Sequence, residues 1–301
     1  MYINNNSMAT NVANTLTSHY SNLATSTQRL SSGLRINSAA DDAAGLAIRE
    51  LMRSDITAMQ QGIRNANDAI SLLQTADGAL GVIDEKLIRM KELAEQAATG
   101  TYDSVQRMMI ESEYQQMASE ITRIANATDF NGIHLLNGNL SAENHHGNSL
   151  DDASHPGKMK IHFGTANDSA EDYYYIQIGN CTASALGIGN QSDTSSTEKA
   201  KGASISTQQD AQEAIVAINQ AIVSKDKIRA HLGALQNRFE NTISNLTIQA
   251  ENLQAAESRI SDVDVATEMT NFVRNQILTQ SAVAMLSQAN SMPQMAMQLI
   301  G

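Results

Sequence analysis

The sequence predicts a mainly α-helical protein: an elongated rod of long antiparallel coiled-coil helices with a small β-hairpin region, whose two termini pair as an additional helical domain. Apolar residues make up 42% of the 301-residue chain and are mostly helix formers such as Ala, Leu, Ile and Met, whereas aromatic residues contribute only 4%. The chain has two prolines, Pro156 and Pro293, so the strongest helix breaker is rare. Helical periodicity is sustained over residues 1 to about 135 and about 204 to 301, but not between them.

The first helical segment lies within residues 1–40. Its apolar residues recur at steps of three, four or seven and so lie on one face of a helix; they are Val12, Leu16, Tyr20, Leu23, Leu30 and Leu34. Ser, Thr, Asn and Gln fill the other positions. A break follows at residues 35–42, where Ser38 and Asp41 have the spacing of a capping box.

The second helical segment runs from about Ala43 to Ala98. Its apolar steps alternate between four and three, which is typical of a coiled-coil seam: Met59, Ile63, Ala66, Ile70, Leu73, Leu80, Ile83, Leu87, Met90 and Ala94. Asp77 interrupts the seam, and a polar seam residue usually fixes register or partner choice. After a turn at Gly100 and Thr101, Ser104 is the predicted cap of a helix that ends near Ala127.

The middle of the chain predicts a short β region between loops. Phe130-Asn131-Gly132 and Asn137-Gly138 favour tight turns around the apolar run 133–136. Residues 158–163 alternate polar and apolar side chains, and residues 173–178 are a second β-prone run, so we expect one hairpin. The segments 141–157 and 182–202 are predicted loops.

The C-terminal half begins with Thr207 and Asp210, again at capping-box spacing. The seam that follows contains Ile215, Ile218, Ile222, Ile228, Leu232, Leu235, Phe239, Ile243, Leu246, Ala250 and Leu253. A helix over 208–256 would be on the order of 70 Å long and should pair with the helix over 43–98. We therefore expect three domains: a terminal helical domain from 1–42 with 260–301, a coiled-coil domain from 43–138 with 204–259, and a short β and loop region over 139–203.

The two terminal segments carry more apolar surface than a pair of helices can hide. The last segment contains Val265, Met269, Phe272, Val273, Ile277, Val283, Met285, Leu286, Met292, Met295, Met297, Leu299 and Ile300. Such a broad apolar face predicts an assembly interface, with the tails ordering as they pack against neighbours.

Sequence motifs at the joints between these helices closely resemble those of bacterial flagellin. The matching segments are 28–39, 41–45, 64–68, 232–239, 258–268, 288–290 and 293–294, and the resemblance covers roughly residues 7–138 and 205–300. Only about 65 residues separate the two halves, so the chain is similar to a short flagellin without the large outer variable domains.

The resemblance implies a structural subunit that polymerises into the flagellar filament for swimming motility. The terminal helices would build an inner tube and the coiled coil an outer tube. Implied partners are other flagellin subunits, the flagellin export chaperone and flagellar secretion apparatus, and the filament cap and hook-junction proteins. We expect an extracellular flagellar location reached without a cleaved signal peptide, since residues 1–7 lack such a signal. The expected polymerisation residues are Leu16, Leu23, Leu30, Leu34, Phe272, Ile277, Leu286, Leu299 and Ile300.

The resemblance also carries over a recognition site. Flagellins detected by the vertebrate Toll-like flagellin receptor use an Arg, a Leu four residues on and a Glu on the neighbouring helix, which match Arg89, Leu93 and Glu113. An alternative is that these residues form an exposed face that packs against the next subunit, and both can hold. The C-terminal motif of the cytosolic immune sensor is only partly kept at Leu299 and Ile300.

Other chemistry is not expected. The histidines at 145, 146, 155 and 162 lack helical ligand spacing, so no metal or cofactor is predicted. Asp262 and Asp264 are expected to cap helices, and no catalytic arrangement predicts an enzyme. A net charge of −12 argues against nucleic acid, and no apolar run suits a membrane. Cys181 is expected to be a small buried hydrophobe or an inert thiol, with a reactive thiol as the alternative. The rival functions are a hook–filament junction protein and an immune-ligand or adhesive binding module.

Overall fold

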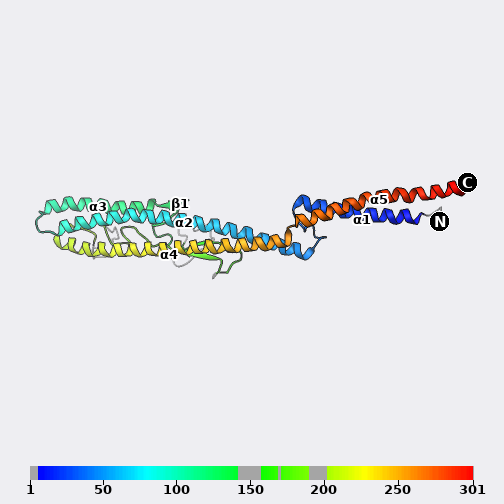
Figure 1. Ribbon diagram of the computed structural model, residues 1–301. Helices are drawn as coiled ribbons and strands as arrows, with labels where there is room; N and C mark the ends of the chain where they lie inside the picture. The colour runs from blue at the N-terminus through cyan, green and yellow to red at the C-terminus, as the bar shows by residue number, and fades with distance from the viewer. Residues whose placement is uncertain (1–5, 142–156, 169–170, 190–201, 301) are drawn as a thin grey trace. The chain divides into compact units, whose positions relative to one another are not determined.

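The computed structural model describes residues 6–141, 157–168, 171–189 and 202–300, with the side chains of residues 293 and 296–300 left out (Figure 1). Long helices dominate it, so the predicted mainly α-helical class is confirmed. The elements are α1 (Ser7–Ser32), α2 (Ala43–Ala98), α3 (Ser104–Ala127), β1 (Asp129–Phe130), β2 (Ile133–His134), β3 (Met159–His162), β4 (Tyr173–Ile176), α4 (Gln208–Ser261) and α5 (Val265–Ile300).

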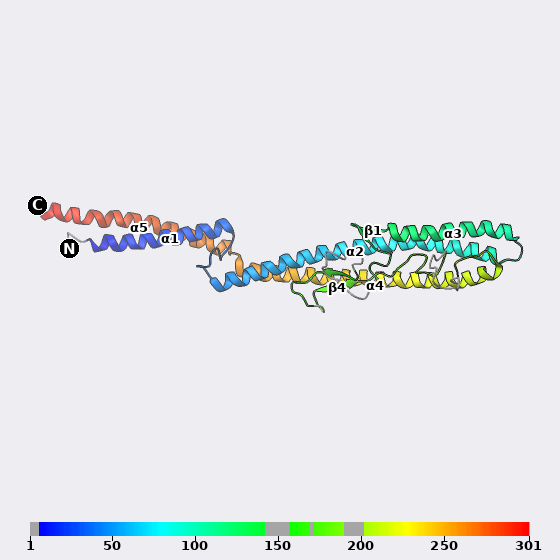
Figure 2. The ribbon, with the colours of Figure 1, turned by 180° about the vertical axis from the view of Figure 1, so that it is seen from behind.

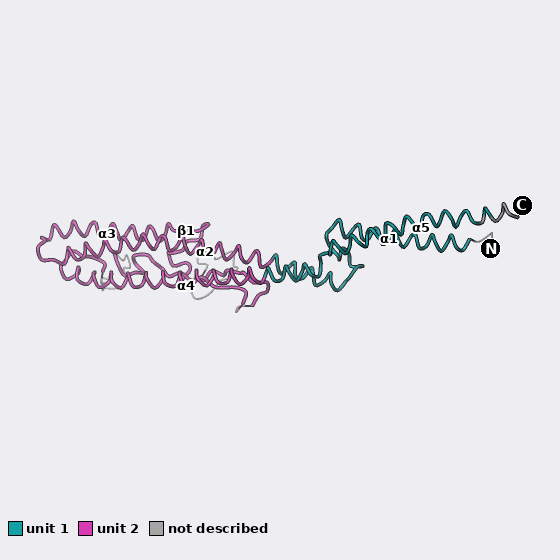
Figure 3. The backbone as a smooth tube through the Cα atoms, viewed as in Figure 1, with its two compact units in different colours: residues 1–57, 250–301 teal, residues 58–249 magenta. Residues whose placement is uncertain are grey.

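The chain divides into two compact units, coloured separately in Figure 3. Unit 1 contains residues 1–57 and 250–301, and unit 2 contains residues 58–249. Helices α2 and α4 each contribute residues to both units. The unit limits therefore fall inside these two helices, whereas the three expected domains end where helices end. The division into those three domains stays a prediction.

Unit 2 is built around the predicted coiled-coil seam. The α2 residues Leu73, Leu80, Ile83, Leu87 and Met90 are at most 1% exposed, which confirms the seam. They form one core with buried residues of α3 and α4, namely Tyr114, Ala118, Ile121, Ala214, Ile218, Leu232, Leu235 and Phe239. Burial of this apolar surface stabilises unit 2 by about 25 cal/mol per Å².

Two charged pairs cross the seam between α2 and α4. Arg229 Nε lies 2.7 Å from Asp77 Oδ1, so the polar seam residue expected from the sequence has a cationic partner. One turn further along, the side chain of Lys225 is only 2% exposed, and its Nζ lies 2.5 Å from Asp84 and 2.7 Å from Asp226. Burial lowers the pKa of Lys225, but hydrogen bonds to Asp226 and Asp84 outweigh it and raise this pKa above its ordinary value.

The predicted hairpin is confirmed as the antiparallel pair β3–β4, with His162 opposite Tyr173 and Met159 opposite Ile176. The hairpin packs against the helices of unit 2 through Tyr174, whose ring centre is 5.8 Å from that of Phe239. Residue 62 of α2 is a glycine because a Cβ there would lie 2.0 Å from the carbonyl oxygen of Phe163. The second strand pair, β1–β2, turns through Asn131 and Gly132, which both have positive φ as the Asn-Gly pattern predicts.

Of the three predicted caps, Thr207 was confirmed, Ser104 was wrong by one residue, and the Ser38–Asp41 pair forms a hydrogen bond in the loop but does not cap α2. The α2 cap is Asp42, whose Oδ1 accepts from Gly45 N, whereas Asp41 instead accepts from the amides of Asn37 and Ser38 in the preceding loop. The α3 cap is Asp103 rather than Ser104, because Asp103 completes a capping box with Gln106. Thr207 caps α4 as predicted, since its Oγ1 accepts from Asp210 N.

Candidate functional site

In unit 1 the terminal helices α1 and α5 lie side by side, as the sequence predicts, in both views of the ribbon (Figures 1 and 2). The residues that this pair buries are small or polar: Ser26 on α1, and Glu268, Thr279, Ala282 and Ala289 on α5, each at most 9% exposed. At one end, Asn6 Nδ2 donates to the carbonyl oxygen of Ala289 over 2.9 Å. Small residues at the contact allow close approach, but bury little apolar area.

Most of the large apolar residues of α5 lie outside this contact. Eight of them, between 39% and 59% exposed, form a surface that we call the α5 apolar face: Val265, Met269, Val273, Ile277, Leu278, Val283, Met285 and Met295. On α1, Met8 and Tyr20 are also more than half exposed. An exposed apolar surface this extended usually marks a site that another protein covers.

The expected polymerisation residues are distributed between the helix contact and this face. Leu16, Leu23, Leu30 and Leu34 are half-buried, as are Phe272 and Leu286, whereas Ile277 is 57% exposed and belongs to the α5 apolar face. The side chains of Leu299 and Ile300 are outside the described residues. Seven of the eight residues of the α5 apolar face belong to the apolar surface that the sequence analysis expects to be an assembly interface, and Leu278 was missed, although its apolar side chain in the same helix could have indicated it.

The joint of unit 1, where α1 ends and α5 begins, is held by backbone hydrogen bonds. Gly33 ends α1 with a φ of 74°, and its carbonyl accepts from Val263 N over 3.0 Å. Arg35 N donates to Ser261 O over 2.7 Å, and the Arg35 guanidinium donates to Ile260 O over 2.7 Å. These contacts involve the segments 28–39 and 258–268 that carry the family resemblance.

Charged side chains brace the same joint. Arg49 is 8% exposed and donates to the carbonyl of the fully buried Ile36 over 2.7 Å. Arg29 lies between Asp41 at 3.8 Å and Glu268 at 3.9 Å. Backbone amides of Ser38 and Asn37 lower the pKa of Asp41, so this carboxylate stays charged in the loop. The joint therefore fixes the backbone where α1 ends and α5 begins. Its charged side chains stabilise this local structure.

The paired carboxylates Asp262 and Asp264 take part in hydrogen bonds at helix ends, as expected. Asp264 accepts from the hydroxyl of Thr267 at 2.8 Å and from Ala266 N at 3.0 Å at the start of α5. The hydroxyl and amide of Thr267 lower the pKa of Asp264. Asp262 accepts from Ser258 Oγ over 2.7 Å. Both carboxylates are thus engaged in local structure.

The three receptor residues predicted by resemblance lie together on α2 and α3 of unit 2, but at different depths. Arg89 Nη2 lies 2.8 Å from Glu113 Oε1, and both side chains are more than 40% exposed. Arg89 also pairs with Glu92 at 3.0 Å. Leu93 is only 2% exposed and packs in the core. The surface therefore presents the Arg89–Glu113 pair, while Leu93 supports the helix turn beneath it.

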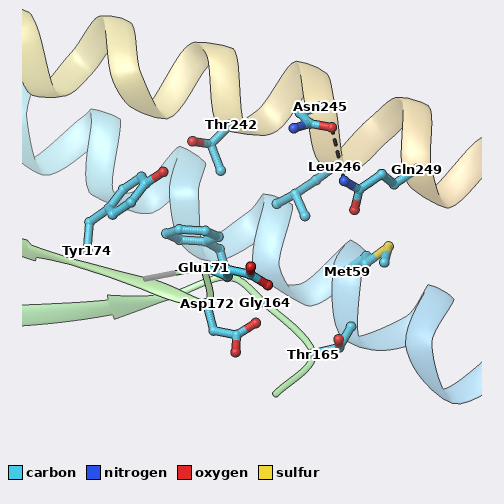
Figure 4. Close-up of a pocket in the computed structure, with 11 residues that line it drawn as sticks. Met59, Gly164, Thr165, Glu171, Asp172, Tyr174, Thr242, Asn245, Leu246 and Gln249 are labelled. Atoms are coloured by element: carbon cyan, nitrogen blue, oxygen red, sulfur yellow. Dashed lines mark hydrogen bonds between the residues drawn. The ribbon is translucent and has the colours of Figure 1, made fainter. Parts of the chain in front are cut away.

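A hollow of about 480 Å³ lies between the loop after β3 and helices α2 and α4 (Figure 4). Its lining is mostly polar, with side chains of Thr165, Glu171, Asp172, Thr242, Asn245 and Gln249 around Met59 and Leu246. Amides of Asp168 and Ala166 donate to Asp172 and lower its pKa. The Asp172 carboxylate therefore stabilises the loop by accepting these hydrogen bonds, and the contacts do not indicate a catalytic acid or base.

The structure also bears on the metal ligands, the cysteine and the membrane helices considered from the sequence. Within the described ranges, no three His, Cys, Asp or Glu side chains gather closely enough to hold a metal ion. Three of the clustered histidines, at 145, 146 and 155, lie outside those ranges, and His162 contacts the carbonyl of Ala166 at 2.8 Å. Cys181 is fully buried, and burial raises the pKa of its thiol to about 11. None of the helices described here combines the length and apolar character needed to cross a membrane.

Comparison with known proteins agrees with this geometry. The family models for the bacterial flagellin N-terminal and C-terminal helical regions match residues 3–141 and 215–300. The flagellar filament 33 kDa core protein of Treponema phagedenis is 41% identical over 300 residues, and the flagellin of Bacillus subtilis (strain 168) is 40% identical over 312 residues. Each alignment covers 100% of both chains.

Among solved structures, a protein assigned as a flagellar hook-associated protein from Vibrio parahaemolyticus is similar in fold. It gives a TM-score of 0.55 at 15% identity and covers 74% of this chain and 100% of its own. At this identity the likeness concerns the fold alone. The sequence matches span both helical halves and the full length of relatives that are equally short, as expected for a flagellin without the large variable domains. The chain belongs to the bacterial flagellin family.

Proposed function

We propose that this chain is the structural subunit of a flagellar filament and polymerises by covering the α5 apolar face with other copies of itself. The α1–α5 pair supports this proposal because it leaves more large apolar side chains exposed than it buries. Its fully buried residues are small or polar and its larger apolar residues, such as Phe272 and Leu286, are only half-buried, while eight large apolar side chains of α5 are left at 39–59% exposure. In a helix pair that functions as a monomer, such side chains would be expected in the contact between the helices.

The size of the α5 apolar face indicates how much it contributes to assembly. Covering a half-exposed Val, Leu, Ile or Met side chain stabilises a complex by roughly 1 kcal/mol. Eight such residues give on the order of 8 kcal/mol, whereas association costs about 4–15 kcal/mol in lost freedom. The face can therefore drive polymerisation together with further contacts, but hardly alone.

Family membership supports the wider setting of this proposal. The similar protein of Treponema phagedenis is named as a flagellar filament core protein. By analogy, we infer an extracellular subunit of the flagellum that serves swimming motility and is exported without a cleaved signal peptide. Its partners would be the export chaperone and flagellar secretion apparatus before assembly, and the cap and hook-junction proteins at the filament ends.

The rival role of a hook–filament junction protein is less well supported. The chain is about 40% identical over its full length to filament proteins and flagellins, but only 15% identical to the hook-associated protein that shares its fold. A junction protein would also cap polymers instead of extending them, and this difference is directly testable.

The test is polymerisation of the purified chain with filament seeds or precipitating salt, followed by sedimentation and electron microscopy. We expect wild-type chains to form long tubes. Ile277→Asp combined with Met285→Asp places charges on the α5 apolar face at exposed positions, so the monomer should fold but fail to sediment. Val82→Asp, at an exposed position of unit 2, is the matched control and should still polymerise. Tubes of normal length from the double variant would refute the proposal, and decoration of hook ends alone would favour the junction protein.

We further infer that the vertebrate Toll-like flagellin receptor recognises the surface around Arg89 and Glu113. The support is their exposed ion pair, which presents a planar guanidinium and a carboxylate at a fixed position. In a receptor reporter assay on monomers, Arg89→Ala and Glu113→Ala should each reduce the response about tenfold or more. Glu92→Ala, which removes the peripheral partner of Arg89, is the control. Equal responses from all four proteins would contradict this role.

A further inference from the structure

The β3–β4 hairpin has a second face whose residues are not part of the core of unit 2. Successive side chains of a strand lie on opposite faces, and Met159, Ile161 and Tyr174 on the inner face pack against the core. Tyr174 points from β4 toward the helices (Figure 4). The opposite positions, all half-buried or exposed, form a surface that we call the outer hairpin face: Lys158, Lys160, His162, Tyr173, Tyr175 and Gln177.

Aromatic rings and a cation lie together on the outer hairpin face. The strand register places Lys160 opposite Tyr175 and His162 opposite Tyr173. The rings of His162 and Tyr173 stack with their centres 6.2 Å apart, and those of Tyr173 and Tyr175 meet edge to face at 5.4 Å. Lys160 Nζ lies 3.6 Å from the centre of the Tyr173 ring. Tyr175 is 38% exposed, so its ring is open to a partner.

The charge of this face contrasts with the acidic character of the chain. The chain has 20 Lys and Arg against 32 Asp and Glu, yet the six positions of the outer hairpin face hold two lysines and no carboxylate. Lys160 Nζ also donates to Asn167 Oδ1 over 3.2 Å. Neither this amide oxygen nor the Tyr173 ring is anionic, so neither neutralises the charge of Lys160. The face therefore favours a partner that carries negative charge.

Contacts beneath the hairpin hold the outer hairpin face in place. The Tyr174 ring centre lies 4.6 Å from that of Phe163 and 5.8 Å from that of Phe239 on α4. Asn65 on α2 donates to the carbonyl oxygen of His162 over 2.8 Å. Both strands are thus fixed against the long helices. A surface that is ordered beforehand loses little entropy when a partner covers it.

A polysaccharide that carries carboxylate groups matches this face in three ways. A sugar ring has C–H bonds on its faces and hydroxyls at its rim, and tyrosine likewise combines an apolar ring with a hydroxyl. The extended strand from Lys158 to His162 spans about 13 Å, which suits a chain of sugars more than one small molecule. A nucleic acid strand carries a phosphate about every 3.4 Å and needs more cations than two lysines. Carboxylates on a polysaccharide are at least one sugar ring apart.

We propose that the outer hairpin face binds an acidic polysaccharide. The ring of Tyr175 packs against a sugar ring, and the ammonium group of Lys160 pairs with a carboxylate of the polymer. This binding function goes beyond polymerisation and does not depend on it, because a single chain carries the whole face.

Affinity electrophoresis of the unassembled full chain tests this binding. Native gels contain polygalacturonate, a polymer of a carboxylated sugar, or uncharged dextran, and each mobility is compared with that in a polymer-free gel. We expect only polygalacturonate to retard the wild-type chain. Tyr175→Ala and Lys160→Gln should each weaken binding about five- to tenfold. Lys91→Gln removes the same charge from a half-buried position on α2, and this matched control should bind like wild type.

A further variant separates binding from folding: Tyr175→Phe keeps the ring and should bind within about twofold of wild type. No retardation of the wild-type chain, equal retardation by dextran, or unchanged binding in both Tyr175→Ala and Lys160→Gln would overturn the proposal. Stronger retardation by single-stranded DNA than by polygalacturonate would also overturn it, in favour of a nucleic-acid partner. Because the chains are unassembled, each of these results leaves the filament role standing.

Discussion

Two glycines on helix α2 should respond in opposite ways to the same substitution. At Gly62, a Cβ would lie 2.0 Å from the carbonyl oxygen of Phe163, which is backbone and cannot swing aside. At Gly78, nothing lies within 4 Å of the added atom. Gly62→Ala therefore tests how the β3–β4 hairpin docks on α2, and Gly78→Ala measures the helix propensity alone.

The expected magnitudes follow from these environments. Gly78→Ala should stabilise the protein by about 0.5–1 kcal/mol, because Ala is the better helix former. Gly62→Ala has the same gain, but overpacking costs about 1–3 kcal/mol. Moving Phe163 away also weakens the 2.8 Å hydrogen bond from Asn65 to His162 O, at a cost of about 1 kcal/mol. The net loss for Gly62→Ala is about 2 kcal/mol, so the two variants should differ by about 2–3 kcal/mol.

Urea unfolding followed by circular dichroism measures this difference, with the slope m checked for constancy. Hydrogen exchange adds a local readout, since the amides of Phe163 and Gly164 donate to Asp172 O in the docked hairpin and should exchange faster in Gly62→Ala. If Gly62→Ala is as stable as Gly78→Ala, the close approach of the hairpin to α2 is wrong.

Three other changes probe the polar contacts of unit 2. Lys225→Met leaves Asp84 without its buried partner and should cost about 2–3 kcal/mol in urea unfolding, whereas adding Asp84→Leu should recover most of the loss; additive effects of the two changes would contradict their coupling. The pKa of Asp172 is lowered in the folded chain, so its stabilising effect is present above the unfolded pKa and is lost as pH falls through the folded value. The loop amides that donate to Asp172 should therefore exchange their hydrogens faster below about pH 4, and Asp172→Asn should remove that pH dependence. Tyr114→Phe removes one of the two hydrogen bonds to Gly202 O, which still accepts from Gly189 N over 3.1 Å, and should lower stability by about 1 kcal/mol; thermal melting that matches wild type would argue against this bond.

Local patterns in the sequence were sufficient to predict the helices and the hairpin. The four-and-three spacing from Met59 to Ala94 predicts α2 and its buried side, because side chains at those steps share one face of a helix. The alternation of polar and apolar residues over 158–163 predicts the hairpin strand, because successive side chains of a strand lie on opposite faces. The cap at Asp103 was missed because Ser104 offers the same chemistry one position away, and the cap at Asp42 was missed because Ser38 and Asp41 have capping-box spacing but make their hydrogen bond in the loop before α2.

Contacts between distant segments were not predictable in this way. Lys225 was left out of the predicted seam because a lysine is ordinarily exposed, and only Asp84 and Asp226, brought near by folding, make its burial tolerable. Nothing in the sequence around Gly62 indicates that the Phe163 carbonyl, 101 positions away, packs against it. Leu93 matched a receptor motif by position, yet its burial depends on how α2 packs with the rest of unit 2.

Methionine oxidation in monomers and in polymers measures whether other copies cover the α5 apolar face. Met269, Met285 and Met295 are 45%, 59% and 48% exposed in the isolated chain, so a mild oxidant should convert all three to sulfoxides in monomers. Mass spectrometry of peptides would then give each rate. We expect polymerisation to slow oxidation of these three methionines about tenfold or more. Equal rates in monomers and in well-formed tubes would contradict it, because the face would then remain open to solvent in the polymer.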